Sequence, residues 1–234
     1  METTATELPN GQGYSISGSK TWITNSPIAD LCVVWAKCKW DGKIRGFLLE
    51  KGMKGLECPP IKGKLSLRAS ITGMILMDDV HIPKENLLPH VEGLKGPFSC
   101  LNNARYGIAW GVIGALEGAL DLTRTYALER KQFGNPLAKY QLVQAKLAQA
   151  STDAAYGLLA AWQVGKLKDE GRLAPEMVSM IKRQNCDRAL VGTRVLQEVF
   201  GGNAVSDEYH IGRIGHNLHV VQTVITLEVG LIIV

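Results

Sequence analysis

The chain has 234 residues, and its hydrophobic content of 46% is enough for one large domain or two small ones to bury a core. It carries 26 Lys and Arg residues against 22 Asp and Glu, which gives a net charge of +4. Because the two signs are interleaved, the sequence excludes a basic stripe of the kind that binds nucleic acid, although the small cationic excess suits an anionic ligand.

Cysteine usage and the two ends of the chain bear on its compartment and on membrane insertion. The irregular cysteine spacing, without a C-x-x-C pair, predicts neither a zinc site nor a disulfide framework, and a reducing compartment fits best. Residues 1–11 are polar and acidic and predict no secretory or transit peptide. Val220–Val234 is apolar but short for a membrane span and contains Glu228, so it predicts a buried segment. The cysteines are Cys32, Cys38, Cys58, Cys100 and Cys186.

Residues 1–90 have the pattern of a small antiparallel β domain. Leu31–Ala36 is apolar throughout and predicts a buried strand, and Asp41-Gly42 predicts a hairpin turn between it and Ile44–Leu49. Met74–Val80 predicts a further strand. Gly, Pro and Asp separate these short runs, as is typical of strands joined by turns.

Residues 98–234 have the pattern of a helical bundle. After a linker at Val91–Pro97, apolar side chains recur at helical spacing and predict helices over about 100–131, 137–170, 175–199 and from 207 onward. Asn102 or Asn103 is a candidate N-cap of the first helix. Long helices with apolar stripes pack as an up-down bundle, so the expected fold class is α+β, a small antiparallel β domain followed by an up-down α-helical bundle.

The stretch Lys20–Ser26 is the most informative motif. It follows a short strand pattern at Tyr14–Gly18 and places a flat aromatic, Trp22, two residues before a small hydroxyl, Thr24. Such a pair can cover one face of a planar cofactor and hydrogen-bond its edge, although a core Trp at a strand end is the structural alternative. The stretch resembles the flavin-contacting loop of acyl-CoA dehydrogenases, most closely that of the glutaryl-CoA dehydrogenases, and the resemblance extends to about Gln222.

The resemblance implies FAD as the cofactor, with Trp22, Ile23 and Thr24 beside its isoalloxazine ring and Ser26 against the acyl-CoA. A second stretch that follows the family closely opens the first predicted helix, where backbone amides and Arg105 would attract an anion. Plain caps and surface charges are the alternative there. By resemblance its substrate-binding residues are Phe98, Ser99, Cys100, Leu101, Asn102, Asn103, Ala104 and Arg105.

Two further motifs are candidate cofactor sites. The resemblance implies that Arg130 and Gln141 reach the FAD of a neighbouring subunit, and Phe133 can pack against an adenine or ribose, so a homo-oligomer, a tetramer, is expected. A basic helix end complementing the helix dipole is the alternative. The second motif has paired glycines that let a backbone approach a dinucleotide, although a helix C-cap is the usual explanation. Its candidate contacts are Glu198, Val199, Phe200, Gly201 and Gly202.

The family's catalytic base has no counterpart. Removing an α-proton from a thioester needs a placed carboxylate, and in the family a glutamate supplies it. The corresponding position is Ile225, which cannot accept a proton. Glu228 is a weak substitute, because three residues along a helix displace it by about 5 Å. We predict no catalytic residue and no metal site, and expect His210, His216 and His219 to lie on the surface or in the bundle.

The resemblance as a whole implies oxidative decarboxylation of glutaryl-CoA to crotonyl-CoA, with electrons passed to an electron-transfer flavoprotein in the mitochondrial matrix. The family's N-terminal helical domain and usual C-terminal end have no match in the sequence, so we interpret the chain as a fragment with absent or impaired activity. Two alternatives stay open. One is a non-catalytic fragment that binds FAD or acyl-CoA or assists assembly, and the other is a gene-model artefact without function.

Overall fold

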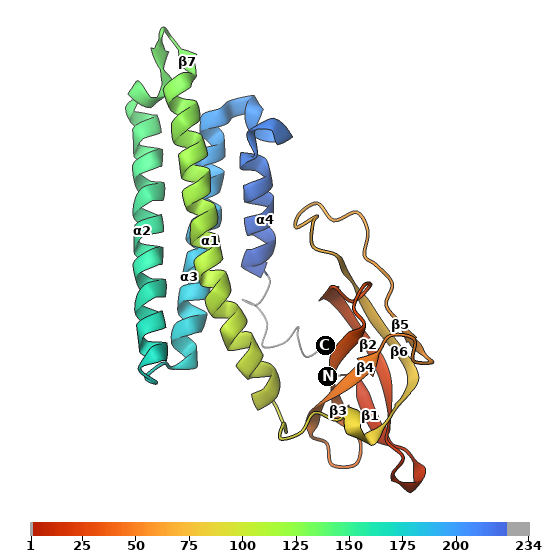
Figure 1. Ribbon diagram of the computed structural model, residues 1–234. Coiled ribbons are helices and arrows are strands. Elements are labelled where there is room, and N and C mark those ends of the chain that lie inside the picture. The colour runs from red at the N-terminus through yellow and green to blue at the C-terminus, as the bar shows by residue number, and fades with distance from the viewer. Residues whose placement is uncertain (1, 224–234) are drawn as a thin grey trace. The chain divides into compact units, whose positions relative to one another are not determined.

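The computed structural model describes residues 2–223 (Figure 1). These residues form two compact units, one up to Cys100 and the other from Leu101 onward. The first unit contains all six strands of one sheet, and the second contains most of four long helices. The expected α+β class, strands first and helices after, is confirmed.

The sheet of the first unit has the strand order β4-β3-β1-β2-β6-β5. Every neighbouring pair is antiparallel except β1 and β3, which run parallel. The predicted hairpin is confirmed, because β3 and β4 pair from Leu31 opposite Glu50 to Lys37 opposite Ile44. The strands are β1 (Thr4–Glu7), β2 (Tyr14–Thr24), β3 (Leu31–Cys38), β4 (Ile44–Glu50), β5 (Leu56–Glu57) and β6 (Thr72–Ile82).

Alternating burial along the strands builds the core of this unit. In β3, every second side chain from Cys32 to Cys38 points inward, as the two-residue period of a strand requires. The inward side chains form one apolar cluster with fully buried Ile16, Phe47 and Leu49 at its centre. This cluster gives the sheet a rigid inner face on which the candidate loop is held.

Two bulges interrupt the pairing of β2 with β6. Between Ile16 and Gly18 the extra residue belongs to β6, and between Lys20 and Ile23 it belongs to β2. Each bulge contains a non-glycine residue with left-handed backbone, Asp79 at φ 51° and Trp22 at φ 60°. The two offsets cancel, so Thr24 pairs with Thr72 in the register that the strands had before the first bulge.

The second unit is a bundle in which successive helices run in opposite directions (Figure 1). Asn185 of α3 ties three of them together, since its buried Nδ2 donates to Ala109 O of α1 at 3.0 Å and to Gly157 O of α2 at 3.1 Å. Gly157 permits this approach, because a Cβ there would lie 2.4 Å from Ile113 Cδ1. The helices are α1 (Lys95–Glu129), α2 (Gln141–Asp169), α3 (Pro175–Phe200) and α4 (Ile211–Thr223).

Two helix starts differ from prediction. The first helix begins at Lys95 rather than near residue 100, so Asn102 and Asn103 lie inside α1 and cap nothing. The second begins at Gln141 rather than residue 137. A small hairpin of β7 (Lys131–Gln132) and β8 (Asn135–Pro136), and then a single 3-10 turn, occupy the intervening residues.

Candidate functional site

Trp22 lies in the bulge of β2 and points away from the core. Its side chain is 62% exposed, so the structure does not place it as the core tryptophan that the sequence left as an alternative. Thr24 is exposed as well, whereas Ile23 between them packs against the apolar cluster of the sheet. The bulge therefore holds an indole and a hydroxyl outward while Ile23 anchors the backbone that carries them.

Ser26 lies just beyond this strand and is buried. Its Oγ donates to Ile23 O at 3.2 Å, which commits the hydroxyl to the turn. Gly73 of β6 allows the turn to fold down, because a Cβ at this glycine would lie 2.8 Å from Ser26 Oγ. Ser26 also lines a cavity of about 180 Å³ inside the first unit, so a ligand would reach it only through that cavity.

The stretch from Phe98 to Arg105 occupies the first three turns of α1 and faces several directions. Arg105 is buried and its Nη1 donates to Ser179 Oγ of α3 at 3.4 Å. Asn103 Oδ1 accepts from Lys168 Nζ of α2 at 3.0 Å. The expected attraction of an anion by helix-end amides together with Arg105 is wrong, because α1 begins ten residues earlier, about 15 Å away along the axis.

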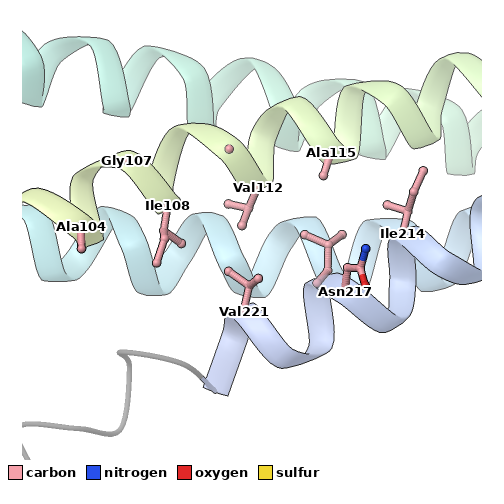
Figure 2. Close-up of a pocket in the computed structure, with 10 residues that line it drawn as sticks. Ala104, Gly107, Ile108, Val112, Ala115, Ile214, Asn217 and Val221 are labelled. Carbon is pink, nitrogen blue, oxygen red and sulfur yellow. The ribbon is translucent and has the colours of Figure 1, made fainter. Parts of the chain in front are cut away.

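An apolar groove of about 480 Å³ lies between α1 and α4 (Figure 2). Small residues of α1, spaced three or four apart, form one wall and leave room beside the helix. The wall from α4 is apolar except for the amide of Asn217. Of the predicted substrate residues, Ala104 alone lines it. The lining residues are Ala104, Gly107, Ile108, Gly111, Val112, Ala115, Ile214, Asn217, Leu218 and Val221.

Sequence reasoning missed this groove, although it had a signal. The small residues Gly107, Gly111 and Ala115 recur on the same helical face as Ala104. That spacing alone indicates a close approach of another helix or a ligand, and it does not say which. Only the pairing of α1 with α4 shows that space remains between them.

Phe133 stands at the tip of the β7–β8 hairpin. It has left-handed backbone, φ 50°, as does the following Gly134 at 78°, and its ring is 91% exposed. A bulky residue in this conformation is an outlier that points to function. Arg130 and Gln141, at the two sides of the hairpin, are exposed too. The structure thus brings these three candidate cofactor residues to one end of the bundle.

The paired glycines lie at the same end. Phe200 is buried and stacks on Tyr126 of α1 with ring centroids 4.4 Å apart, and Val199 is buried beside it. Glu198 is exposed and pairs with Lys146 of α2. Gly201 caps α3 through its amide, which donates to Glu198 O, so the C-cap role is met. Glu198, Gly201 and Gly202 remain accessible, while the two apolar side chains serve the core.

Two groups of candidate residues therefore sit at opposite ends of the helical unit. Arg105 belongs to α1 and Arg130 directly follows the last residue of this helix, so about 37 Å along the helix axis separates them. Ile225 and Glu228 lie outside the described residues. Within residues 2–223, His210, His216 and His219 are exposed and no cluster of potential metal ligands occurs.

Comparison with known proteins places both units. The family described as acyl-CoA dehydrogenase, middle domain, matches residues 1–80, and acyl-CoA dehydrogenase, C-terminal domain, matches residues 92–223. The chain belongs to the acyl-CoA dehydrogenase family. None of the helices described between residues 2 and 223 has the length and apolarity to cross a membrane.

Individual relatives have similar folds but different named substrates. Glutaryl-CoA dehydrogenase of Desulfococcus multivorans is 31% identical over 91% of this chain and 56% of its own length. Cyclohexane-1-carbonyl-CoA dehydrogenase of Syntrophus aciditrophicus is 31% identical over 92% and 57%. The solved glutaryl-CoA dehydrogenase of Mycobacterium smegmatis in complex with FADH2 is 39% identical with a TM-score of 0.92, and the match covers 96% of this chain and 57% of that one. The chain thus spans 56–57% of the length of these three proteins.

Proposed function

We propose that this chain supplies the flavin-facing and acyl-facing parts of an FAD-dependent acyl-CoA dehydrogenase that acts on glutaryl-CoA. The exposed indole of Trp22, held outward by a bulge, is the observation that carries the proposal. Among solved structures, the 39% identity with a glutaryl-CoA dehydrogenase, against 30% with a butyryl-CoA dehydrogenase, favours that substrate. An electron-transfer flavoprotein as acceptor, a homotetramer and the mitochondrial matrix stay predictions.

The residues of the first unit fit a flavin. Trp22 and Thr24 offer a flat apolar face and a hydroxyl donor on the same short stretch, and neither is buried in the core. When bound, FAD supplies the acceptor for the hydride that leaves the β-carbon of the acyl group. Thr24 would then donate a hydrogen bond to the ring edge, where negative charge develops.

The groove between α1 and α4 fits an acyl chain. Its size and apolar lining suit a short hydrocarbon, which gains free energy when it leaves water. Asn217 offers the one polar side chain of the lining, an amide that can orient a polar group. The same groove does not distinguish glutaryl from other short acyl groups, so specificity rests on the comparisons.

The far end of the bundle fits the cofactor of a second copy. Arg130 follows α1 about 37 Å along the helix axis from Arg105, with Phe133 and Gln141 at the same end, and this is too far for one ligand to contact all four. An exposed guanidinium can pair with a pyrophosphate, and an exposed ring can stack on an adenine. A homo-oligomer would therefore complete each site.

A second function has support from one residue. By resemblance, Ile225 stands where the family has its catalytic glutamate, so a chain that binds FAD or acyl-CoA without turning over, or that assists assembly, is the alternative. Turnover with glutaryl-CoA, measured after FAD reconstitution, separates the two. Under the enzyme proposal, the Ile225→Glu variant gains turnover over the unmodified chain. Bound FAD without any gain favours the non-catalytic alternative.

Flavin retention after gel filtration tests the cofactor site. Trp22→Ala should lose the flavin absorbance that the unmodified chain retains. Trp162→Ala is the matched control, because it removes another exposed indole, 53% accessible, from α2. Equal flavin retention in both variants would remove the support for Trp22 as a cofactor contact.

A further inference from the structure

Two free thiols share a cavity in the first unit. Cys32 belongs to β3, and Cys58 follows directly after β5. Both line the cavity of about 180 Å³ that also exposes Ser26. Cys58 packs against the apolar cluster that contains Cys32, so the two side chains approach each other from different parts of the chain.

The two thiols lie in or next to strands that are not neighbours in the sheet. In the sheet, β3 and β5 are separated by β1, β2 and β6, and no hydrogen-bonded ladder joins them. The short connection from β4, which pairs with β3, leads into β5 and brings Cys58 to the inner face near Cys32. A covalent bond at this place would add a direct link between β3 and the residue after β5, which no ladder joins directly.

We propose that Cys32 and Cys58 form a reversible disulfide site, closed by a low-molecular-weight disulfide of the glutathione type. This proposal is independent of the proposed function. Cys58 is only partly buried and is the thiol that the oxidant reaches first, whereas Cys32 is buried beneath it. Each thiol supplies the partner that the other needs to form a disulfide.

The exchange proceeds in two balanced steps. The Cys58 thiolate attacks one sulfur of the small disulfide, forms a mixed disulfide, and releases one small thiolate. The Cys32 thiolate then attacks the Cys58 sulfur, forms the Cys32–Cys58 bond, and releases the second small thiolate. The two protons from the protein thiols end on the two small thiols, so two protein thiols are oxidised while one small disulfide is reduced.

The second step, attack by the Cys32 thiolate, limits the rate of disulfide formation. Burial, together with the neighbouring Cys58, raises the pKa of Cys32 to about 11, so its thiolate is scarce at neutral pH. Slow closure suits a bond that forms under sustained oxidation rather than in a brief pulse. Once formed, the bond would restrain the turn that holds Ser26, since that turn lines the same cavity.

Peptide mapping of the full chain tests the proposal. After incubation with oxidised glutathione, non-reducing digestion should give a Cys32–Cys58 linked peptide that has lost two hydrogen masses and is split again by a reductant. At one fixed ratio of oxidised to reduced glutathione, the linked form should be roughly tenfold more favoured at equilibrium in the folded chain than in urea, because folding raises the effective concentration of one thiol near the other. Equal proportions of the linked form in both conditions, or glutathione that stays on Cys58 without a linked peptide, would overturn the proposal.

Matched variants assign the bond. Cys38→Ala removes another buried thiol of β3, Cys100→Ala removes an exposed one, and both should still form the linkage. Cys58→Ser should leave Cys32 unmodified. Hydrogen exchange of residues 25–30 should slow on oxidation of the unmodified chain and stay unchanged in Cys58→Ser. Exchange that slows equally in both, or a linkage that moves to Cys38, would contradict the assignment.

Discussion

The two compact units treat a buried lysine in opposite ways. In the sheet, Lys20 of β2 is 7% exposed, and its Nζ has no hydrogen-bond partner among the described residues. In the bundle, Lys182 of α3 is 1% exposed, and its Nζ donates to Val221 O at 3.0 Å and to Gln222 O at 3.4 Å, both in α4. The same ammonium group is thus uncompensated in one unit and bonded in the other.

The hydrogen bonds of Lys182 join two helices, whereas the buried ammonium of Lys20, unpaired within residues 2–223, destabilises the sheet unit. A buried charge costs free energy unless hydrogen bonds replace its water, and burial accordingly lowers the pKa of Lys20. Lys182 fastens the end of α4 to α3, where the chain leads on to the predicted position of the base. Lys20 immediately precedes the bulge that holds Trp22, so the destabilising buried charge lies beside the candidate cofactor contact.

Replacing Lys182 should produce the largest effect. Lys182→Met removes hydrogen bonds from a charged donor to two carbonyl groups and should destabilise the helical unit by about 3 kcal/mol. Urea unfolding, with hydrogen exchange of α3 as the local probe, measures the change. The exposed neighbour provides the control: Arg183→Met should cost less than about 0.5 kcal/mol. Similar losses of unfolding free energy in both variants would contradict a stabilising role of the Lys182 hydrogen bonds between α3 and α4.

Raising the pH above 9 should destabilise the sheet unit through ionisation of Cys32. Its pKa rises from 9.0 when unfolded to about 11 when folded, so the folded state holds the proton longer. Stability of the sheet unit is therefore complete below pH 9 and falls between pH 9 and 11, by about 1–2 kcal/mol after allowance for solvent access. The difference between the unmodified chain and Cys32→Val isolates this contribution from other titrating groups. If the difference in stability between the two proteins does not vary between pH 9 and 11, the raised pKa of Cys32 is contradicted.

Replacing Lys20 should have a smaller effect of opposite sign. Lys20→Met should stabilise the sheet unit by about 1 kcal/mol at pH 7, because it removes an uncompensated charge and keeps an apolar stem. Since the folded pKa of Lys20 is lowered, the gain shrinks as pH rises toward 10.5, where the unfolded lysine also becomes neutral. Thermal unfolding at two pH values measures it. Lys37→Met, on exposed β3 surface, should show no such gain.

The smallest effect should come from the hairpin tip. Phe133→Asn replaces a strained left-handed phenylalanine by a residue that tolerates this backbone, so stability should rise by about 0.5 kcal/mol. The proposed contact with a neighbouring cofactor would be lost, and flavin retention should fall. Thermal unfolding and flavin absorbance on one preparation measure both. A loss of stability would show that the ring supports the hairpin.

The sequence predicted the strands and helices better than their ends. Asp41-Gly42 marked its hairpin because the turn chemistry is local. The start of α1 was missed because Gly96 and Pro97 are typical of a linker, although proline is well tolerated in the first turn of a helix, where its missing N–H matters least.

Features formed by two segments that are distant in the sequence could not be predicted from it. The bulge at Trp22 depends on what β6 places opposite it, and the groove depends on which helix packs against α1. The resemblance supplied Trp22 and Thr24, which are exposed as a ligand contact requires. It could not foresee that Val199 and Phe200 would be taken up by the bundle core.

The paired bulges of β2 and β6 constrain how this sheet can change in length. Deleting Trp22 alone would leave β6 one residue in excess, and everything after it in β2 would shift by about 3.3 Å against its partner. Thr24 and the turn of Ser26 would then meet different neighbours and face the opposite side. Deleting Asp79 at the same time would restore the match, so insertions and deletions here are tolerable only when both strands change together.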